Sequence, residues 1–390
     1  MKKQRKQRIL VFIDWYLPGY KAGGPVRSMA NVTAHLASEF DFYIVTRNTE
    51  YGESEPYSTV RADSWNDVQP GVQVWYASQG RASLIQWRKL IQTVKPDVVY
   101  INGIYSPFFS LLPLVAARLL KWPKIIVAPR GMLGQGALDI KSTRKLYYLR
   151  LCKILGLYRH IIWHATADTE TAEIKKRIAA HATVVEAANL PVKREDHFSS
   201  VPIVKNKGGV RLCFISRINR KKNLLQGIEA LRALPSDVTV KYDIYGPTDD
   251  KAYWEKCLDL MAHLPTHIQV SYQGVVAPSD IQSVFQEYHA LLLPTHHENF
   301  GHVILECLMA GRPVIISDQT PWRHLSETKA GWDVSIDEST ALIRTIEQLA
   351  AMDQTTYDQW AQGAWELGSK AIHNDELLDR YRSMFGHEGL

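Results

Sequence analysis

This sequence has few cysteines and lacks a long hydrophobic run, and each of these two features excludes a class of protein. The four cysteines, Cys152, Cys213, Cys257 and Cys307, lie far apart without a C-x-x-C pair. This excludes a disulfide framework and a cysteine zinc site, and predicts buried thiols in a reducing compartment. No stretch reaches the roughly 18 apolar residues that span a bilayer. The apolar run that ends before Asp14 is also too short for a signal peptide, so we expect a cytoplasmic protein.

Two short motifs are also missing. Without G-x-G-x-x-G, a hydride-transferring dehydrogenase is disfavoured. Without D-x-D, the chain lacks the carboxylate pair that holds Mg²⁺ or Mn²⁺ in metal-dependent sugar transferases. His296, His297 and His302 cluster in the sequence, but a catalytic metal needs three well-placed ligands and loop histidines are usually only polar. We expect no divalent metal and no cofactor, and a net charge of +6 does not indicate a nucleic acid partner.

Short apolar runs alternate with helical patterns along the chain, which is typical of parallel sheets covered by helices. The pattern breaks at residues 191–209, which are rich in Pro, Gly and charge. We predict an α/β fold with two Rossmann-like domains, 1–200 and 201–365, facing a central cleft. The pattern is purely helical near the C-terminus, so residues 366–390 are predicted to return as a helix to the first domain.

Basic and aromatic residues gather in residues 141–160. On a helical wheel the cations fall on both sides, which favours a packed helix whose basic side chains reach solvent. An anionic membrane surface is the alternative partner, because the basic tail at residues 2–8 adds positive charge to the same half of the chain.

Residues 290–306 are the most informative segment. A buried strand ends near Pro294, a polar loop follows, and Phe300-Gly301 opens an apolar helix. Glu298 lies in the loop and Glu306 inside the helix, where a carboxylate is costly unless it binds something. Ligands of open α/β sheets bind beyond the carboxyl ends of strands, at helix N-termini that favour anions. Two acids around such a turn predict hydroxyl groups on both sides of a phosphate, as in a sugar nucleotide.

Candidate ligand-binding residues also follow the earlier strands of the second half of the chain. Arg217 and Lys222 follow its first strand, where both side chains suit phosphate oxygens, although a solvated basic loop is the alternative. Gly246 and then Gly274-Val275 end the next two strands. Small residues there let the main chain approach a base or phosphate, although each is also an ordinary turn residue.

Three places in the first half follow strand ends in the same way. Gly23-Gly24 precedes Pro25 at a helix entry that suits an anion, or that is simply a helix start. Asn102 and Arg130 follow two later strands. Arg130 is predicted to bind phosphate or an acceptor, with a structural ion pair as the equal alternative.

The motif Glu298-x-Phe300-Gly301-x-x-x-x-Glu306, with Arg217 and Lys222 upstream, resembles the retaining glycosyltransferases of the GT-B fold, in particular glycosyltransferase family 4 (glycosyl transferases group 1). The resemblance implies that Arg217 and Lys222 bind the donor diphosphate and stabilise the leaving group. It implies that Glu306 binds the ribose hydroxyls and that Glu298 contacts the donor sugar.

The same resemblance implies further donor contacts: main-chain N–H groups at Phe300, Gly301 and His302, the base beside Gly274 and Val275, Gly246 at a strand end, and the phosphates near Gly23 and Gly24. The sequence departs from the family in three places, one of which is Asn299, where glycine is frequent. Asn102-Gly103 stands where many relatives carry a histidine, and Arg220-Lys221 replaces a common Pro-Glu pair.

The implied activity is transfer of a sugar, with retention and without metal, from a UDP- or GDP-linked donor to a carbohydrate acceptor. The acceptor is expected to be a lipid-linked glycan in surface polysaccharide biosynthesis, which would make the enzyme cytoplasmic and peripheral at the inner face of the cell membrane. Two alternatives stay open. One is a sugar-nucleotide epimerase of the same fold, and the other is a non-catalytic nucleotide-sugar or glycan-binding protein.

Overall fold

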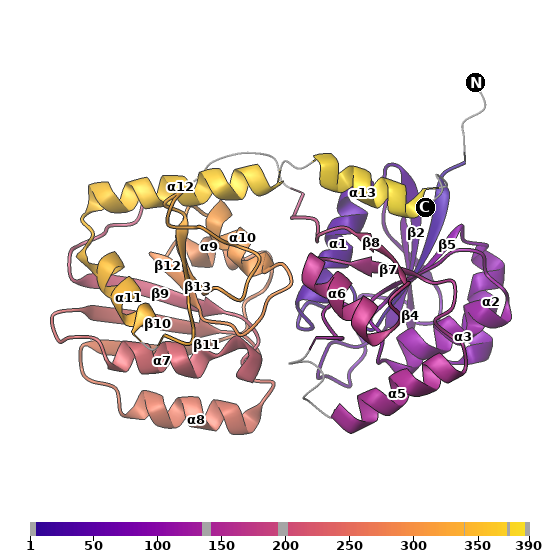
Figure 1. The fold of residues 1–390 in the computed structure, drawn as a ribbon, viewed down its shortest axis with the longest axis horizontal. Coiled ribbons are helices and arrows are strands. Elements are labelled where there is room, and N and C mark those ends of the chain that lie inside the picture. The colour runs from indigo at the N-terminus through magenta and orange to yellow at the C-terminus, as the bar shows by residue number, and fades with distance from the viewer. Residues whose placement is uncertain (1–4, 135–141, 194–201, 339, 373–374, 387–390) are drawn as a thin grey trace. The chain divides into compact units, whose positions relative to one another are not determined.

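The computed structural model describes residues 5–134, 142–193, 202–338, 340–372 and 375–386. The chain forms two compact units (Figure 1). Met1–Lys193 and Asn374–Leu390 make up the first unit, and Arg194–His373 the second. The first unit is therefore assembled from both ends of the chain.

An eight-stranded sheet in the order β3-β4-β2-β1-β5-β6-β7-β8 forms the centre of the first unit. Its strands are β1 (Gln7–Ile13), β2 (Phe40–Arg47), β3 (Trp65–Gln69), β4 (Val72–Ala77), β5 (Val98–Asn102), β6 (Ile125–Ala128), β7 (Ile162–Ala165) and β8 (Thr183–Glu186). All neighbours run parallel except β3 and β4. The central strands are mostly apolar and buried because helices cover both of their faces.

Helices of the first unit divide between the two faces of this sheet. Side chains of α1 (Gly24–Leu36) and α13 (Asp375–Phe385) enter one core. The other core takes side chains from α2 (Leu84–Val94), the π-helical turn η1 (Pro107–Leu111), α3 (Leu112–Leu119), α5 (Ser142–Ile154) and α6 (Asp168–Arg177). Residues 107–119 thus form a π turn followed directly by an α-helix, with a proline at the start of each.

The C-terminal helix α13 packs onto the first sheet, as the sequence predicts. The ring of Phe385 lies edge-on to Phe40, Phe42 and Tyr100, with centroids 5.8 to 6.0 Å apart. The Arg382 guanidinium also donates to the Glu39 carboxylate at 2.8 Å. The preceding helix, α12 (Gln354–Ile372), belongs to the second unit.

The second unit is built on a six-stranded parallel sheet in the order β11-β10-β9-β12-β13-β14. Its strands are β9 (Gly209–Ile215), β10 (Thr239–Tyr245), β11 (Ile268–Gly274), β12 (Ala290–Leu293), β13 (Val314–Ser317) and β14 (Gly331–Val334). Besides α12, its helices are η2 (Arg220–Lys222, a 3-10 turn), α7 (Leu224–Arg232), α8 (Lys251–Ala262), α9 (Ile281–Phe285), α10 (His302–Met309) and α11 (Ala341–Ala351). This is the Rossmann strand order, whose direction reverses between β9 and β12.

The predicted pair of Rossmann-like sheets is confirmed, and the four cysteines are buried thiols. Two strands, β3 and β14, carry too little apolar pattern to be predicted from the sequence. β3 is mostly exposed and carries no apolar run, and it forms only as the antiparallel edge of β4. β14 has only four residues and is recognisable only by its pairing with β13.

Replacing Phe385 with alanine should lower the free energy of unfolding of the first unit by about 3 to 5 kcal/mol, because a buried aromatic ring leaves a cavity. Urea unfolding followed by tryptophan fluorescence measures this. Ser383→Ala, at an exposed position of the same helix, is the matched control. Equal stability of the two variants would contradict the packing of α13 on the first sheet.

Buried His289 should make the second unit less stable in acid. Burial lowers its pKa to about 4, with Val204 O acting in the opposite sense and nearby Lys205, Arg211 and Arg312 lowering it further. Its Nδ1 accepts from the Arg211 N–H at 2.8 Å, and Nε2–H donates to Val204 O at 3.0 Å. Between pH 6.5 and 4 the unfolded chain takes up a proton that the folded chain refuses, so stability falls as pH falls.

The measurement is the difference in unfolding free energy between wild type and His289→Gln, from denaturant titrations at several pH values. Relative to this always-neutral variant, wild type should lose roughly 3 kcal/mol between pH 7 and pH 4. A difference that does not change with pH would show that His289 has the same pKa in the folded and the unfolded protein.

Candidate functional site

Lys222 and Glu298 meet beyond the carboxyl ends of β9 and β12, at the point where the strand order of the second sheet reverses. The Lys222 ammonium contacts Glu298 Oε1 directly, and both side chains are only 13% exposed. Asn219 starts the short η2 turn, and its side chain accepts from the Lys222 N–H at 3.3 Å. The sequence therefore orients this lysine through a local cap.

Main-chain hydrogen bonds hold the two loops in register. The His296 N–H and the Thr295 hydroxyl both donate to Lys221 O, at 2.8 and 3.0 Å. The Glu298 N–H donates to Gln319 O at 3.1 Å, which ties the same loop to the segment after β13. The position of the Glu298 carboxylate is thus set by backbone contacts on two sides.

The start of α10 adds hydrogen-bond donors to this edge of the sheet. Gly301 begins the helix with a φ of +77°, and a Cβ there would lie 2.6 Å from Ile304 Cδ1. Phe300 is fixed because Trp322 Nε1 donates to its carbonyl oxygen at 2.6 Å. The first-turn N–H groups of a helix have no acceptor within it and favour anions. Glu306 lies just over one turn further and is half-buried.

Arg217 also follows β9, and its charge is held in place by an aspartate. Arg217 NH1 lies 3.4 Å from Asp249 Oδ2, and the arginine side chain is 38% exposed. A second pair, Arg220 Nε with Asp250 Oδ2 at 3.2 Å, lies beside it. Asp250 also caps α8 by accepting from the Tyr253 N–H at 3.0 Å. The end of β9 thus presents cations supported by the loop after β10.

Gly246 lets the ends of β9, β10 and β11 approach one another. Its φ is +139°, and a Cβ would lie 1.9 Å from Ser216 O. Its N–H donates to Gly274 O at 2.8 Å, and its carbonyl accepts from Tyr272 Oη at 2.9 Å. Val275, just beyond, is 39% exposed.

In the first unit, Gly23 and Gly24 lie where predicted, at the N-terminus of α1. Gly23 is the N-cap residue, Gly24 is the first residue of the helix, and Pro25 follows. A Cβ at Gly24 would meet nothing within 4 Å, so this position faces open space. Close approach of another molecule, rather than packing, is what a glycine permits here.

Asn102 and Arg130 are brought together at the ends of β5 and β6. Arg130 Nε donates to Asn102 Oδ1 at 2.7 Å, NH1 to Asn189 Oδ1 at 2.7 Å, and NH2 to Tyr100 Oη at 2.8 Å. Tyr100 in turn donates to His164 Nδ1 at 2.7 Å. The planar fork of Arg130 is therefore engaged with its own unit on all three nitrogens.

The buried end of this network is neutral. Burial, and then the positive charge of Arg130, lower the pKa of His164 to about 3. His164 Nε2–H donates to Ala187 O at 2.8 Å, which leaves Nδ1 as the acceptor for Tyr100. The Arg130 guanidinium is thus positioned by a chain of oriented donors.

Three supporting residues are missing from the sequence prediction: Asn219, Thr295 and Asp249. Asn219 carries a recognisable signal, since asparagine is a preferred helix N-cap. Thr295 and Asp249 carry none, because each acts on a segment far away in the sequence.

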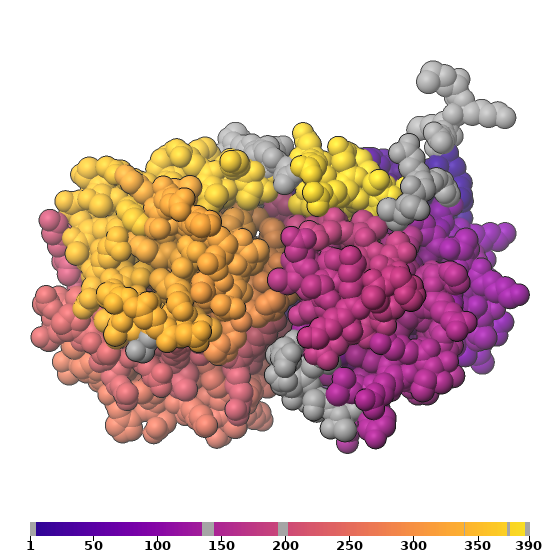
Figure 2. Space-filling model, viewed as in Figure 1, coloured from indigo at the N-terminus to yellow at the C-terminus, as the bar shows by residue number. Residues whose placement is uncertain are grey.

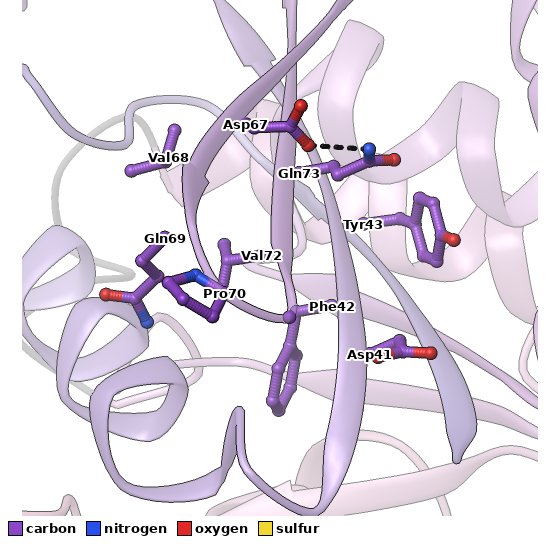
Figure 3. A pocket seen from close by; sticks show the side chains of 10 residues that line it. Asp41, Phe42, Tyr43, Asp67, Val68, Gln69, Pro70, Val72 and Gln73 are labelled. Carbon is purple, nitrogen blue, oxygen red and sulfur yellow. Dashed lines mark hydrogen bonds between the residues drawn. The ribbon is translucent and has the colours of Figure 1, made fainter. Parts of the chain in front are cut away.

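A cavity of about 480 Å³ lies elsewhere in the first unit (Figure 3). It is bounded by the starts of β2 and β4 and by the β3–β4 turn, and the Gln73 amide donates to Asp67 Oδ1 at 2.8 Å between two of the lining residues. This is the amino-terminal edge of the sheet, whereas ligands of such sheets bind at the carboxyl ends. None of the predicted site residues lines it.

Histidine does not form a metal centre with its neighbours in the described part of the chain. There, no group of three or more His, Cys, Asp or Glu side chains is arranged to hold a metal ion. His297 instead contacts Asn299 Oδ1 at 2.7 Å, and burial, followed by the charge of Lys221, lowers its pKa. Among the same described residues, no helix is long and apolar enough to cross a membrane.

Residues 195–366 match the family model of the glycosyl transferases group 1. Three curated proteins are similar in sequence. An uncharacterized glycosyltransferase, MJ1607, of Methanocaldococcus jannaschii is 27% identical over 106 residues, 27% of this chain and 26% of that protein. An uncharacterized 41.2 kDa protein in the cps region of Klebsiella pneumoniae is 19% identical over 76% of this chain and 80% of its own length. A D-inositol 3-phosphate glycosyltransferase of Corynebacterium urealyticum is 26% identical over 44% of this chain and 42% of its own length.

Solved structures share the fold over nearly the whole chain. Sucrose-phosphate synthase from Thermosynechococcus elongatus has a TM-score of 0.69 at 12% identity, covering 98% of this chain and 99% of its own. Anabaena Alr3699/HepE, in complex with UDP and glucose, has a TM-score of 0.69 at 14% identity, covering 97% and 98%. WaaG, a glycosyltransferase involved in lipopolysaccharide biosynthesis, has a TM-score of 0.66 at 13% identity, covering 98% and 100%.

Gly246→Ala should destabilise the second unit by more than about 2 kcal/mol, since a Cβ would collide with a backbone carbonyl and strain φ as well. Gly274→Ala is the matched control, because its φ is also positive, at +81°, but nothing lies within 4 Å. It should cost only about 1 kcal/mol. Thermal unfolding of both variants measures the difference, and an equal cost would refute the close approach of Gly246 to Ser216.

Proposed function

Because this chain has the GT-B fold and carries a glycosyl transferases group 1 domain, we propose that it is a retaining, metal-independent transferase. It would move a sugar from a nucleotide diphosphate to a glycan acceptor. The observation that carries the proposal is the contact between Lys222 and Glu298 at the reversal point of the second sheet. A cation and a carboxylate held there suit a phosphate and the sugar attached to it.

Lys222 and Arg217 are proposed to bind the donor diphosphate. Lysine has three donors, so Lys222 can hold Glu298 and a phosphate oxygen at the same time. Arg217 offers a planar fork on the same loop. The first N–H groups of α10, at Gly301 and His302, and the main chain of Phe300 would complete the anion site. Glu298 would then face the hydroxyl groups of the donor sugar.

Sugar transfer with retention requires stabilisation of the leaving nucleoside diphosphate, and it does not require a separate side chain as general base. The bond from the anomeric carbon to the phosphate oxygen breaks, and the acceptor oxygen forms the new bond on the same face. The acceptor's proton passes to the departing phosphate oxygen and neutralises the negative charge that develops there as the bond breaks. Oriented cations and N–H groups aimed at the developing charge supply most of the rate enhancement.

The nucleoside half of the donor would extend along the edge of the same sheet. Glu306 is proposed to accept hydrogen bonds from the ribose hydroxyls, since it lies just over one turn into α10. Gly246, Gly274 and the exposed Val275 would border the base. UDP is the favoured nucleotide, because the similar HepE structure is a complex with UDP and glucose. A GDP-linked donor is the alternative.

The first unit is proposed to bind the acceptor. Gly23 and Gly24 would admit it closely at the N-terminus of α1, and Asn102 would contact it with an amide oriented by Arg130. WaaG is involved in lipopolysaccharide biosynthesis, and the Klebsiella protein lies in a cps region. These two relatives support a role in surface polysaccharide biosynthesis, and we propose a lipid-linked glycan as the acceptor and the inner face of the cell membrane as the place of the reaction.

Lys222→Ala and Glu298→Ala should each lower the rate of sugar transfer by about 10² to 10³, the usual loss when one group that stabilises the transition state is removed. The assay follows release of nucleoside diphosphate from UDP- and GDP-sugars with a lipid-linked oligosaccharide as acceptor. Arg232→Ala, at an exposed position of α7, is the control. Addition of EDTA should leave the wild-type rate unchanged.

Reactions without acceptor and thermal-shift measurements separate the alternatives. An epimerase would interconvert UDP-sugars without any acceptor, and a non-catalytic binding protein would show a thermal shift with nucleotide but no turnover. Absence of a thermal shift with any UDP-, GDP- or ADP-sugar would overturn the proposed donor site itself.

A further inference from the structure

Helix α5 exposes a row of large apolar side chains along its solvent side. Tyr147, Leu151 and Ile154 are 67%, 56% and 82% exposed. Their spacing of four and then three residues places them on one face of the helix. We call these three side chains the α5 ridge. Single exposed apolar residues are normal, but a contiguous row marks an interaction surface.

The opposite side of α5 is packed, so the helix cannot turn the ridge inward. Leu149 and Cys152 are buried in the core of the first unit. The ring of Tyr148 lies edge-on to Tyr105 with centroids 5.6 Å apart, and Lys145 Nζ lies 5.2 Å from the centroid of that same Tyr105 ring. Figures 1 and 2 show α5 at the outside of the first unit.

Cations border the α5 ridge on both sides. On the helical wheel Arg150 and Lys153 lie along one side of it and Arg144 along the other, and all three are exposed. Residues 140–167 contain no aspartate or glutamate. The helical-wheel prediction of cations on both sides is therefore correct, but the structure shows that an apolar row lies between them and faces solvent.

The apolar surface continues past the end of α5. Leu155 is 62% exposed, and Leu119 at the end of α3 is 58% exposed. The two ends are joined because Arg118 NH2 donates to Gly156 O at 3.1 Å. Two of the N-terminal cations that the structure describes are engaged within the unit, since Arg5 pairs with Asp97 at 2.9 Å and Arg8 donates to Val94 O at 2.9 Å.

We propose that the α5 ridge and its flanking cations dock the protein on an anionic lipid bilayer. Aromatic and aliphatic side chains enter the boundary between headgroups and acyl chains, while Lys and Arg contact the lipid phosphates. A second copy of the chain fits less well, because a symmetric contact would oppose Arg150 and Lys153 to like charges. The proposal does not depend on sugar transfer, since lipid binding needs no donor.

The test is co-sedimentation of the full chain with sucrose-loaded vesicles. Wild type should bind phosphatidylcholine vesicles containing about a third phosphatidylglycerol at least tenfold more tightly than pure phosphatidylcholine vesicles, and 0.5 M salt should weaken this binding. A triple variant, Tyr147→Ser, Leu151→Ser and Ile154→Ser, tests the apolar ridge. A double variant, Arg150→Gln and Lys153→Gln, tests the flanking cations. Each should lower binding about tenfold or more.

Ile85→Ser is the matched control, because Ile85 is 81% exposed on α2 of the same unit. It should bind the anionic vesicles like wild type. Thermal unfolding of each variant checks that folding is retained, and all replaced side chains are exposed. Equal binding of wild type and both α5 variants would overturn the proposal. So would a ridge-dependent dimer in sedimentation equilibrium without vesicle binding.

Discussion

The contact between Lys222 and Glu298 depends on one topological fact, the placement of β12 directly beside β9. These strands are far apart in the sequence, and only the reversal of strand order makes them neighbours. Bringing two charges to a largely buried position is costly unless their geometry is well supported. Here the support comes from main-chain contacts of Lys221, His296 and Glu298. The backbone of the sheet and its loops therefore fixes the positions of the two charged side chains.

Backbone constraints and charge placement act together at the same edge. Gly246 brings the loop after β10 against the end of β9. That loop supplies Asp249 and Asp250, which hold Arg217 and Arg220. A single glycine therefore influences how the cations of the proposed donor site are supported. Preorganised charges of this kind need no rearrangement when a diphosphate binds, which is the condition for efficient electrostatic stabilisation.

The first unit uses its polar residues differently. Arg130 donates to three acceptors within the unit, and a neutral buried His164 completes the chain behind it. Its contribution to the proposed acceptor site is the orientation of Asn102, not a free charge. On the outside, α5 packs one face and exposes an apolar row on the other, so the unit combines a rigid interior with a surface suited to lipid.

Local pattern in the sequence determined the elements and their types, because apolar runs of strand length and helical periods are read without knowledge of neighbours. It also indicated Lys222, Glu298 and the start of α10 as candidates, because each follows a strand end and because Glu306 is conspicuous in an apolar helix. Edge strand β3, the partners Thr295 and Asp249, and the engagement of Arg130 were decided only by the tertiary structure. Each depends on which segments the sheet order brings side by side, and that pairing is a long-range property. The exposed face of α5 was also decided by the tertiary structure. A helical wheel gives the relative positions of the side chains, but only packing decides which face of the helix is turned to solvent.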